Sequence, residues 1–299
     1  VLAGAFDCFA GIKREDLSAE VGKKGETVAE QLLRYGAQRQ SETKLAATSL
    51  FGFDDEEIMA ESRPKIPSAP NWDALVRLNK ERDLVGMYLS AHPLDPYWLE
   101  VTLGVETTAV EKNDISRPTP APIVFAGMVV GLEERKTFSG SMTIVKVEDY
   151  SGTTDFALFE KQKAEFGHLC VPGTAVCVIG TFKQSVNRST GISNLRFNLD
   201  RIMSLDGLKG SLVEELTLKI KPSQVGQIME LLDDPANTGE HEGTDPHRVP
   251  VSMMIYTPDI GRTLTFSTAV RTRLSKDFIK TLEDLNIDYK VRRRSLVAG

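Results

Sequence analysis

The sequence predicts an α+β multidomain fold: a helical N-terminal segment, a five-stranded β-barrel and a small C-terminal α+β domain. Apolar residues recur at helical spacing near the N-terminus, the period changes to that of strands from Pro122, and a second mixture of strand and helix patterns begins near Leu212. A chain of 299 residues, 41% of them hydrophobic, is long enough for two or three soluble domains. We therefore expect domains over 1–117, 118–205 and 206–299.

The N-terminal region is expected to be helical. Residues 1–45 have a helical pattern, in which Val28, Leu32 and Tyr35 recur at the spacing of a helix. Leu75–Tyr88 repeats this pattern, and the prolines that follow are expected to end the second helix because proline cannot continue one.

The stretch between these two patterns has the composition of a loop or linker. Ser49-Leu50-Phe51-Gly52-Phe53 is apolar, the four residues after it are acidic, and three prolines follow before the next helix. Such a composition favours a partly ordered connection over a packed element. We therefore expect a loop near 47–53 and a proline-rich linker over 61–70.

The middle region alternates in the manner of strands. The predicted elements are strands over 123–133, 142–149 and 153–159, a short helix over 161–166, and strands over 175–183 and 195–204. Three strands, a short helix and two strands is the element order of a five-stranded oligonucleotide-binding (OB) barrel. Another small β structure is the alternative.

The last region predicts a separate α+β unit. Its expected elements are a strand over 212–220, a helix over 223–232, a hairpin of 249–256 with 263–267, a helix over 275–285 and a strand over 289–294. Ser223 and Ser275 stand at the expected N-caps of the two helices, where a hydroxyl can accept a backbone N–H.

The charge of the chain does not by itself indicate a nucleic-acid-binding protein. The net charge of the whole chain is −6, and residues 118–205 carry nine basic and eight acidic residues, a balance of +1. Since no part of the chain is strongly basic, any binding to nucleic acid must come from local clusters and from stacking side chains.

No secretory signal and no apolar stretch long enough to span a membrane is visible, so we expect a cytoplasmic protein with no membrane association. The apolar start at Val1 leads us to expect a fragment or processed piece.

Cys8, Cys170 and Cys177 have no spacing typical of metal ligands, and we expect no metal site and buried free thiols.

Basic and aromatic residues gather in two loops of the predicted barrel. Between the first two strands lie Arg135, Lys136 and Phe138, and loops at this place in OB barrels commonly contact the ligand. Single-stranded nucleic acid binds by stacking on aromatics beside basic residues. The full set of candidate nucleic-acid-binding residues is Arg135, Lys136, Phe138, Lys146, Lys183 and Arg188. The alternative is a barrel that serves only as a structural spacer.

Three stretches together resemble one family. The run from Glu81 to Asp95, ERDLVGMYLSAHPLD, closely resembles a segment of the bacterial DNA polymerase III alpha subunit, in which a helix ends in Gly-x-Tyr-Leu-(Ser/Thr)-x-His-Pro before an OB barrel. Ser49–Gly52 stands about where that family has its sliding-clamp peptide, and Gly127–Phe159 resembles its OB segment. The resemblance is strongest over 72–160 and weakest over 206–299.

The resemblance implies three partners: single-stranded DNA, the sliding clamp and a tau-type clamp-loader subunit that binds the last domain. It places the clamp contact at Thr48, Ser49, Leu50 and Phe51, although Ala47 stands where the family pattern usually opens with glutamine. In such a peptide one or two buried apolar side chains supply most of the affinity.

The resemblance also implies that the catalytic palm of the full subunit, with its Mg²⁺ ions, is missing here. No acidic cluster matches the metal-binding carboxylates that nucleotidyl transfer needs. We therefore expect no catalytic residue, no metal site and no cofactor in this fragment, and no DNA-directed DNA synthesis by this chain alone.

Three other interpretations stay open from the sequence. The chain could be a free-standing OB adaptor for single-stranded DNA or RNA, part of a polymerase paralogue used in repair, or a purely protein-binding scaffold. A steep salt dependence of single-strand binding would separate the nucleic-acid binders from the scaffold.

Overall fold

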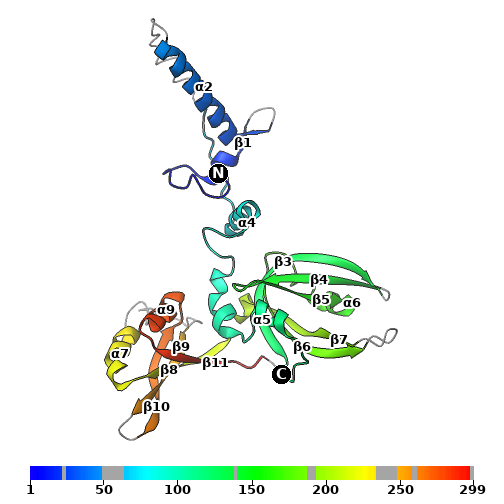
Figure 1. The fold of residues 1–299 in the computed structure, drawn as a ribbon, viewed down its shortest axis with the longest axis vertical. Coiled ribbons are helices and arrows are strands. Elements are labelled where there is room, and N and C mark those ends of the chain that lie inside the picture. The colour runs from blue at the N-terminus through cyan, green and yellow to red at the C-terminus, as the bar shows by residue number, and fades with distance from the viewer. Residues whose placement is uncertain are drawn as a thin grey trace. The chain divides into compact units, whose positions relative to one another are not determined.

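The computed structural model describes residues 1–21, 25–48, 64–137, 140–186, 193–233, 248–257 and 261–296. The chain divides into two compact units, Val1–Pro93 (unit 1) and Leu94–Gly299 (unit 2) (Figure 1). This division falls earlier than the expected boundary after residue 117, so residues 94–117 belong with the two β sheets. The boundary expected after residue 205 stays a prediction.

Unit 1 is mostly helical. Its elements are α1 (Arg14–Ser18), the two-residue strands β1 (Glu20–Val21) and β2 (Glu26–Thr27), α2 (Val28–Thr48) and α4 (Ala74–Val85). The expected helical pattern over 1–45 is wrong for residues 1–13, which form turns, and for the β1–β2 pair.

The second helix ends earlier than the prolines require. Gly86 adopts the left-handed conformation, with φ of 86°, and its N–H donates to the Arg82 carbonyl (2.8 Å). A glycine in this conformation closes a helix without steric cost, so α4 stops several residues before Pro93.

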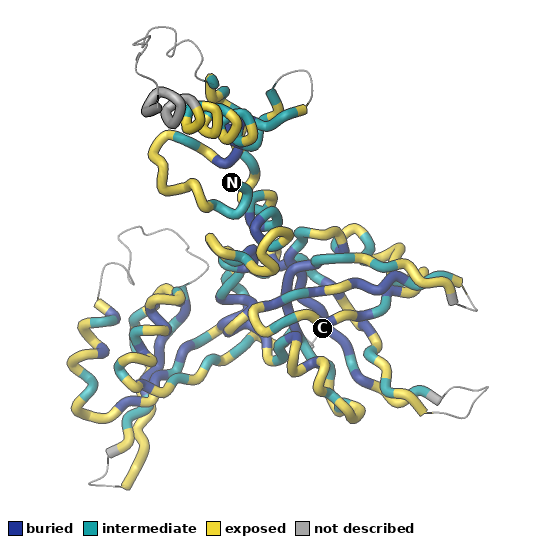
Figure 2. The backbone as a smooth tube through the Cα atoms, turned by 45° about the horizontal axis from the view of Figure 1, so that its top comes forward, coloured by how far each residue is buried: buried dark blue, intermediate teal, exposed yellow. Residues whose placement is uncertain are grey.

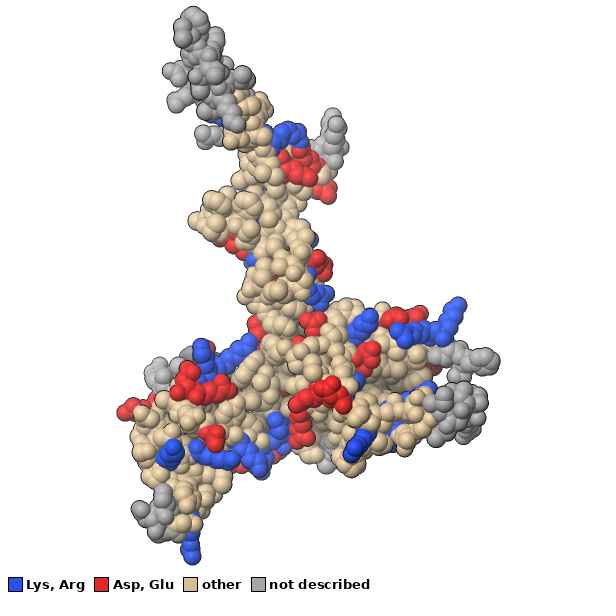
Figure 3. Space-filling model, in the orientation of Figure 1, with Lys and Arg blue, Asp and Glu red and all other residues tan. Residues whose placement is uncertain are grey.

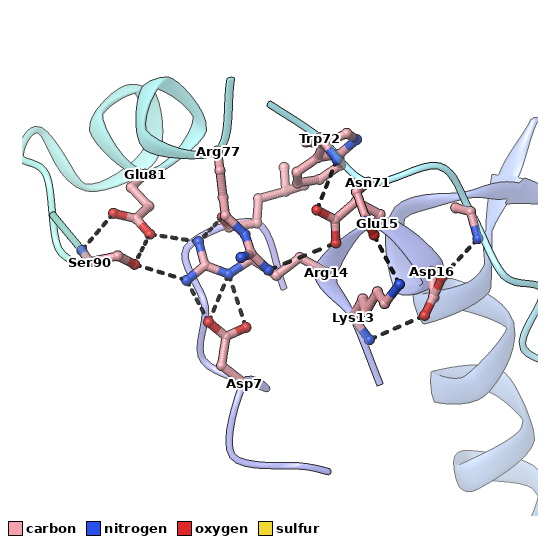
Figure 4. Close-up of polar contacts among 12 residues, drawn as sticks. Asp7, Lys13, Arg14, Glu15, Asp16, Asn71, Trp72, Arg77, Glu81 and Ser90 are labelled. Atoms are coloured by element: carbon pink, nitrogen blue, oxygen red, sulfur yellow. Dashed lines mark hydrogen bonds and ion pairs between the residues drawn. The ribbon is translucent and has the colours of Figure 1, made fainter. Parts of the chain in front are cut away.

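A buried ionic network links distant segments of unit 1 (Figure 4). Arg14 Nη1 lies 2.6 Å from Glu81 Oε1, and Arg14 Nε donates to Asp7 Oδ1 (2.9 Å). Glu81 Oε2 accepts the N–H groups of Leu89 and Ser90, both at 2.9 Å. Burial alone raises the pKa of Glu81, but hydrogen bonds from Ser90 and Arg14 outweigh it and lower that pKa to about 2.

Carboxylates of α1 also hold the chain that leads into α4. Asp16 Oδ1 accepts the Ala69 N–H (2.8 Å), Glu15 Oε1 accepts the Trp72 N–H (3.1 Å), and Lys13 Nζ donates to an oxygen of Asn71 (2.9 Å). Residues 64–73, the described end of the expected proline-rich linker, contain no helix or strand. This segment therefore has no regular structure but is held by side chains of α1 and of Lys13, the residue before it.

Unit 2 contains a five-stranded antiparallel sheet in the order β5-β4-β3-β6-β7. Its elements are β3 (Ile123–Thr137), β4 (Gly140–Glu148), β5 (Thr153–Phe159), α6 (Glu160–Phe166), β6 (Ala175–Val186) and β7 (Ser193–Ser204). The first strand along the chain is central, and the third and fifth lie at the edges, as in an OB fold. The expected fold is confirmed, but as an open barrel, because no ladder joins β5 to β7 among the described strands.

The interior of this barrel follows from strand alternation. Val145 and Val147 are fully buried and pack with Phe125, Phe156 and Val178 in one apolar cluster. Figure 2 shows the buried positions running along the middle of the strands. Successive side chains of a strand point to opposite faces, so the residues between the buried ones form the outer surface.

A second, four-stranded sheet has the order β10-β9-β8-β11. Its elements are β8 (Val213–Ile220), η4 (Pro222–Gln224), α7 (Val225–Asp233), β9 (Arg248–Thr257), β10 (Arg262–Arg273), α9 (Lys276–Asp284) and β11 (Asp288–Arg293). β8 and β9 are parallel and the other pairs antiparallel. Ser275 caps α9 by accepting the Phe278 N–H (3.1 Å), as predicted. Ser223 is not an N-cap, because the 3₁₀ turn η4 already begins at Pro222.

Residues 94–105 join the cores of the two sheets. This segment forms the short 3₁₀ helix η1 (Asp95–Tyr97) and the short π-helix η2 (Glu100–Gly104). Leu99 and Leu103 pack in the core of the four-stranded sheet, whereas Leu94 and Val101 pack against outward-facing residues of the barrel. The segment is therefore part of the packing of unit 2.

The thiols differ in exposure. Cys170 and Cys177 are buried, as expected, but Cys8 is exposed. No helix in the described parts of the chain has the length and apolar character that crossing a membrane requires.

Candidate nucleic-acid interface

A groove with a volume of about 630 Å³ opens where β5 and β7 fail to pair. Met142 and Ile144 of β4 and Ala157 and Phe159 of β5 line one side. Met142 pairs with Phe159 and Ile144 with Ala157, so all four lie on the outer face of the sheet. The Phe159 side chain is 47% exposed, which makes it an accessible apolar surface.

The opposite side of the groove comes from β6 and β7. Phe182 and Phe197 are register partners with ring centroids 5.3 Å apart, and both line the groove. A Cβ on Gly180 would lie 2.3 Å from the Phe197 ring, so the ring position depends on that glycine. Arg196 and Asn198 flank Phe197 in β7, are exposed and also line the groove. This wall therefore presents a cation, an aromatic ring and an amide at successive positions.

One buried cation is among the residues that line the groove. Lys112, in α5 (Ala109–Asp114), is only 5% exposed and is among the lining residues. Its ammonium donates to Thr154 Oγ1 (3.0 Å) and to the Asp155 carbonyl (2.7 Å). Burial lowers the pKa of Lys112 to about 8, and the Asp155 carboxylate partly opposes that shift.

Two of the sequence-predicted residues lie on the outer face that continues into the groove. Arg135 pairs across the sheet with Met142, and Lys146 pairs with Asp155. Both cations approach one carboxylate: Arg135 Nε lies 2.9 Å and Lys146 Nζ 3.8 Å from oxygens of Glu133. The structure brings these cations together, but with an acid already beside them.

The other four predicted residues differ in position. Lys183 is exposed and is the register partner of Arg196, at the β7 side of the groove. Lys136 is exposed and, one residue after Arg135, points to the opposite face of β3. Phe138 and Arg188 lie outside the described residues.

Charges of both signs are interspersed over the barrel on the face drawn in Figure 3. Lys163 of α6, for example, lies 2.6 Å from Glu134 of β3. Long-range attraction of a polyanion is therefore weak on this face, and short-range stacking and single cations must supply the affinity.

The predicted clamp-binding residues fall at the edge of the described chain. Thr48 is the last residue of α2, and Ser49, Leu50 and Phe51 lie outside the described residues. Among the residues that the structure describes, no group of three or more His, Cys, Asp or Glu side chains could hold a metal ion.

Sequence reasoning missed Lys112, Phe159, Arg196 and Phe197. The alternation of the predicted strand over 195–204 contained a signal for two of them, because Arg196 and Phe197 follow each other directly in that strand. Lys112 had no such signal, since a lysine in a short helical turn is ordinarily a solvated surface residue.

Solved structures similar to part of the chain include two single-stranded DNA-binding proteins. One, from S. cerevisiae mitochondria, matches 28% of this chain and 92% of that chain at 16% identity with a TM-score of 0.21. Another, from Streptomyces coelicolor, matches 29% and 93% at 15% identity with a TM-score of 0.20. The OB topology itself follows from the strand order given above.

No protein-family model matches the chain. DNA polymerase III subunit alpha of Vibrio cholerae is 25% identical over 293 residues, which cover 95% of this chain and 23% of that protein. The same subunit of Pseudomonas aeruginosa is 28% identical over 210 residues, 70% of this chain and 17% of that protein. The chain thus spans about a fifth of the length of the curated relatives it matches. It is therefore related to the bacterial DNA polymerase III alpha subunit, as its resemblance to the C-terminal part of that family implied.

Proposed function

We propose that this chain is a non-catalytic part of a bacterial replicative DNA polymerase and that its OB groove binds single-stranded DNA. The observation that carries the proposal is the groove between β5 and β7, which Phe159 lines from one side and Arg196, Phe197 and Asn198 line from the other. OB folds bind oligonucleotides over this face of their second and third strands and between the two adjacent loops.

The chemistry of the groove fits a single strand better than a duplex. A base stacked on an aromatic side chain contributes about 1–3 kcal/mol whatever its identity. Phe159 and Phe197 offer two such surfaces, and Arg196 supplies an exposed guanidinium for a phosphate. Unstacked bases are available only in single strands, so affinity for duplex DNA is expected to be much lower.

The test is fluorescence anisotropy with an oligothymidine across a salt series. Phe159→Ala should weaken binding about tenfold at every salt concentration, because stacking is nearly independent of salt. Arg196→Ala should also flatten the plot of log affinity against log salt by about 1 unit. Phe266→Ala, an exposed aromatic of β10, is the matched control and should change nothing. Unchanged affinity in both groove variants would support a barrel that is only a spacer.

We also propose that Thr48, Ser49, Leu50 and Phe51 bind the sliding clamp. Support comes from the resemblance and from the adjacent apolar pair in this segment. The two apolar side chains would enter a pocket of the clamp, and Ala47 would leave out the amide contact that the family pattern supplies.

The four-stranded sheet offers a surface for the proposed clamp-loader partner. β10 is an edge strand, and Leu264 and Phe266 on it are 41% and 48% exposed. Figure 1 shows the β9–β10 hairpin projecting past α7 and α9. Strands β9 and β10 contain four arginines and no acidic residue. These features favour an acidic, partly apolar partner segment that adds a strand to the edge.

Calorimetry with a tau-type clamp-loader subunit tests this surface. Phe266→Ser should abolish most of the heat of binding, whereas Thr265→Ala, which alters the opposite face of the same strand, should leave it unchanged. Equal binding by both variants would place the contact elsewhere.

The polymerase activity itself is proposed only for the whole subunit. We infer that DNA-directed DNA synthesis and its Mg²⁺ ions belong to a palm domain of the whole subunit, outside the residues that the structure describes. The purified chain should therefore incorporate no nucleotide on a primed template with magnesium. A free-standing single-strand-binding adaptor and a repair paralogue are the rival functions, and clamp binding would argue against the first of them.

A further inference from the structure

The buried Lys112 of α5 has one N–H group that no described residue accepts. Each lysine ammonium carries three N–H groups. Two of those on Lys112 are used by Thr154 Oγ1 and the Asp155 carbonyl, and no third oxygen or nitrogen acceptor for it lies among the described residues. The charge also lies over the rings of Phe125, Phe182 and Phe197, at 5.3, 5.8 and 4.9 Å from their centroids.

Two of those rings are also walls of the groove. Phe182 and Phe197 line it together with Lys112, so the ammonium sits where the aromatic wall meets the barrel interior. A ring face stabilises a cation but is a weaker acceptor than an oxygen. The remaining donor is therefore available to a polar atom of whatever enters the groove.

We propose that Lys112, Phe182 and Phe197 form a nucleobase subsite in which the Lys112 ammonium donates a hydrogen bond to a carbonyl oxygen of one base. This inference rests on the proposed binding of single-stranded DNA in the same groove. It adds a selection that stacking alone cannot give: a base with an outward carbonyl oxygen is bound more tightly than an apolar ring of the same shape.

A base carbonyl fits this position better than a phosphate does. The surroundings of Lys112 are aromatic rings and a buried threonine, and a phosphate would lose its hydration there at high cost. The carboxylate of Asp155, another lining residue, would also repel a phosphate. Arg196, exposed at the rim, is the natural phosphate contact.

A purely structural role explains the lysine less well. An apolar side chain could fill the same space beside Phe125, Phe182 and Phe197 without the desolvation cost of a buried charge. With a pKa of about 8, Lys112 stays mostly protonated at pH 7 and keeps its donor. A buried charged group beside a groove is a common mark of a functional position.

The test crosses two ligands with two proteins. One ligand is an oligothymidine of about ten nucleotides, within the range of OB site sizes. The other has each thymine replaced by difluorotoluene, which keeps the shape and stacking of thymine but accepts hydrogen bonds poorly. The proteins are the unaltered chain and Lys112→Met, and affinity is measured by anisotropy at one salt concentration and by the salt slope.

We expect the unaltered chain to bind the oligothymidine about tenfold more tightly than the isostere, the size of a lost hydrogen bond to a charged group. Lys112→Met should bind both ligands equally, at the affinity that the unaltered chain has for the isostere, with an unchanged salt slope. The isostere thus also reports whether the variant still folds.

Three outcomes overturn the subsite. Equal binding of both ligands by the unaltered chain removes the carbonyl contact and needs no variant. A loss in Lys112→Met that is the same for both ligands, with a slope flattened by about 1 unit, assigns the lysine to a phosphate. The same loss without a slope change assigns it a structural role. If no oligonucleotide binds the unaltered chain at all, it is the proposed function that fails.

Discussion

Unit 1 and unit 2 differ in the forces that stabilise each of them internally. Among the described residues of unit 1, the buried apolar side chains are Leu17, Val28 and Leu78, and the buried charged ones are Arg14, Glu15, Asp16 and Glu81. The described part of unit 2 has three apolar clusters that together span both sheets. Unit 1 therefore depends on a matched set of charges, and unit 2 on packing.

The difference gives a physical meaning to the motif that first suggested the family. Glu81 opens that run, and its carboxylate accepts the N–H groups of Leu89 and Ser90 near its end. Gly86 allows the chain to turn back between them. The motif thus closes a loop onto the end of α4, and its role in this chain is structural.

The largest effect is expected from breaking the network of unit 1. Glu81→Ala leaves Arg14 as a buried, partly uncompensated charge and removes the acceptor of the Leu89 and Ser90 N–H groups, which should lower the free energy of unfolding of unit 1 by about 3–5 kcal/mol. The chain has two tryptophans, Trp72 in unit 1 and Trp98 in unit 2. Urea unfolding followed by the fluorescence of Trp72, in a Trp98→Phe background, measures this loss in the free energy of unfolding of unit 1.

Asp83→Ala is the matched control for that experiment. Asp83 is an exposed carboxylate of the same helix, so its removal should change stability by less than about 0.5 kcal/mol. Trp98 fluorescence in a Trp72→Phe background should report an unaltered transition for unit 2 in both variants. A common transition for both tryptophans would contradict two independently held units.

A second prediction separates the units by function. Leu50→Ala with Phe51→Ala should remove both apolar anchors of the proposed clamp peptide. Two such anchors contribute at least about 2 kcal/mol to binding, so the double variant should lose about thirtyfold in affinity for the cognate clamp. Calorimetry with the clamp measures this. Oligothymidine binding, assigned to unit 2, should not change; unchanged clamp affinity would mean that these side chains only hold the segment in place.

A smaller effect is expected on lowering the pH. The pKa of folded Glu81 is about 2, below its ordinary 4.5, and the pKa values of Asp7 and Glu15 are also lowered. The stability these carboxylates contribute is complete above their ordinary pKa and is lost as the pH falls from about 4.5 towards 2. As the pH is lowered, the fluorescence of Trp72 should therefore report unfolding of unit 1 at a higher pH than Trp98 reports for unit 2. Unfolding of unit 2 at the higher pH would contradict the idea that charges stabilise unit 1 and packing stabilises unit 2.

How much the sequence could predict also differs between the units. In the barrel, strand alternation fixes which side chains are buried, so β5 is predicted to the residue and the other strands to within a few residues. In residues 1–13 the pattern resembled a helix, but those apolar residues are mostly exposed and the buried positions nearby are charged. Hydrophobic periodicity fails where charges form the core.

The candidate site was predicted only in part for a related reason. Composition pointed to the loop with Arg135, Lys136 and Phe138, because cations and an aromatic ring stand together there in the sequence. The groove joins Phe159 of β5, Arg196 and Phe197 of β7, and Lys112 of α5, which only the unpaired edges of the barrel bring together. Spacing along the chain cannot indicate where a barrel stays open.

The last and smallest effect concerns surface charges of unit 2. In Arg135→Ala with Lys136→Ala, we expect unchanged stability, within about 0.5 kcal/mol, because both side chains are exposed and surface pairs contribute little. In contrast, Glu81→Ala is expected to lower the free energy of unfolding of unit 1. The same urea experiment, followed by Trp98, measures it.

The effect of that double variant on binding should also be modest. Arg135 lies beside Glu133, and a phosphate must compete with this carboxylate before a counterion is released. Lys136 has no ion-pair partner among the described residues, but it points away from the groove face. We therefore expect the salt slope for oligothymidine to flatten by about 1 unit or less, whereas two independent phosphate contacts would give close to 2. Anisotropy across a salt series decides between these values. A flattening near 2 units would mean that Glu133 releases Arg135 on binding and that the strand passes over the β3–β4 loop as well as through the groove.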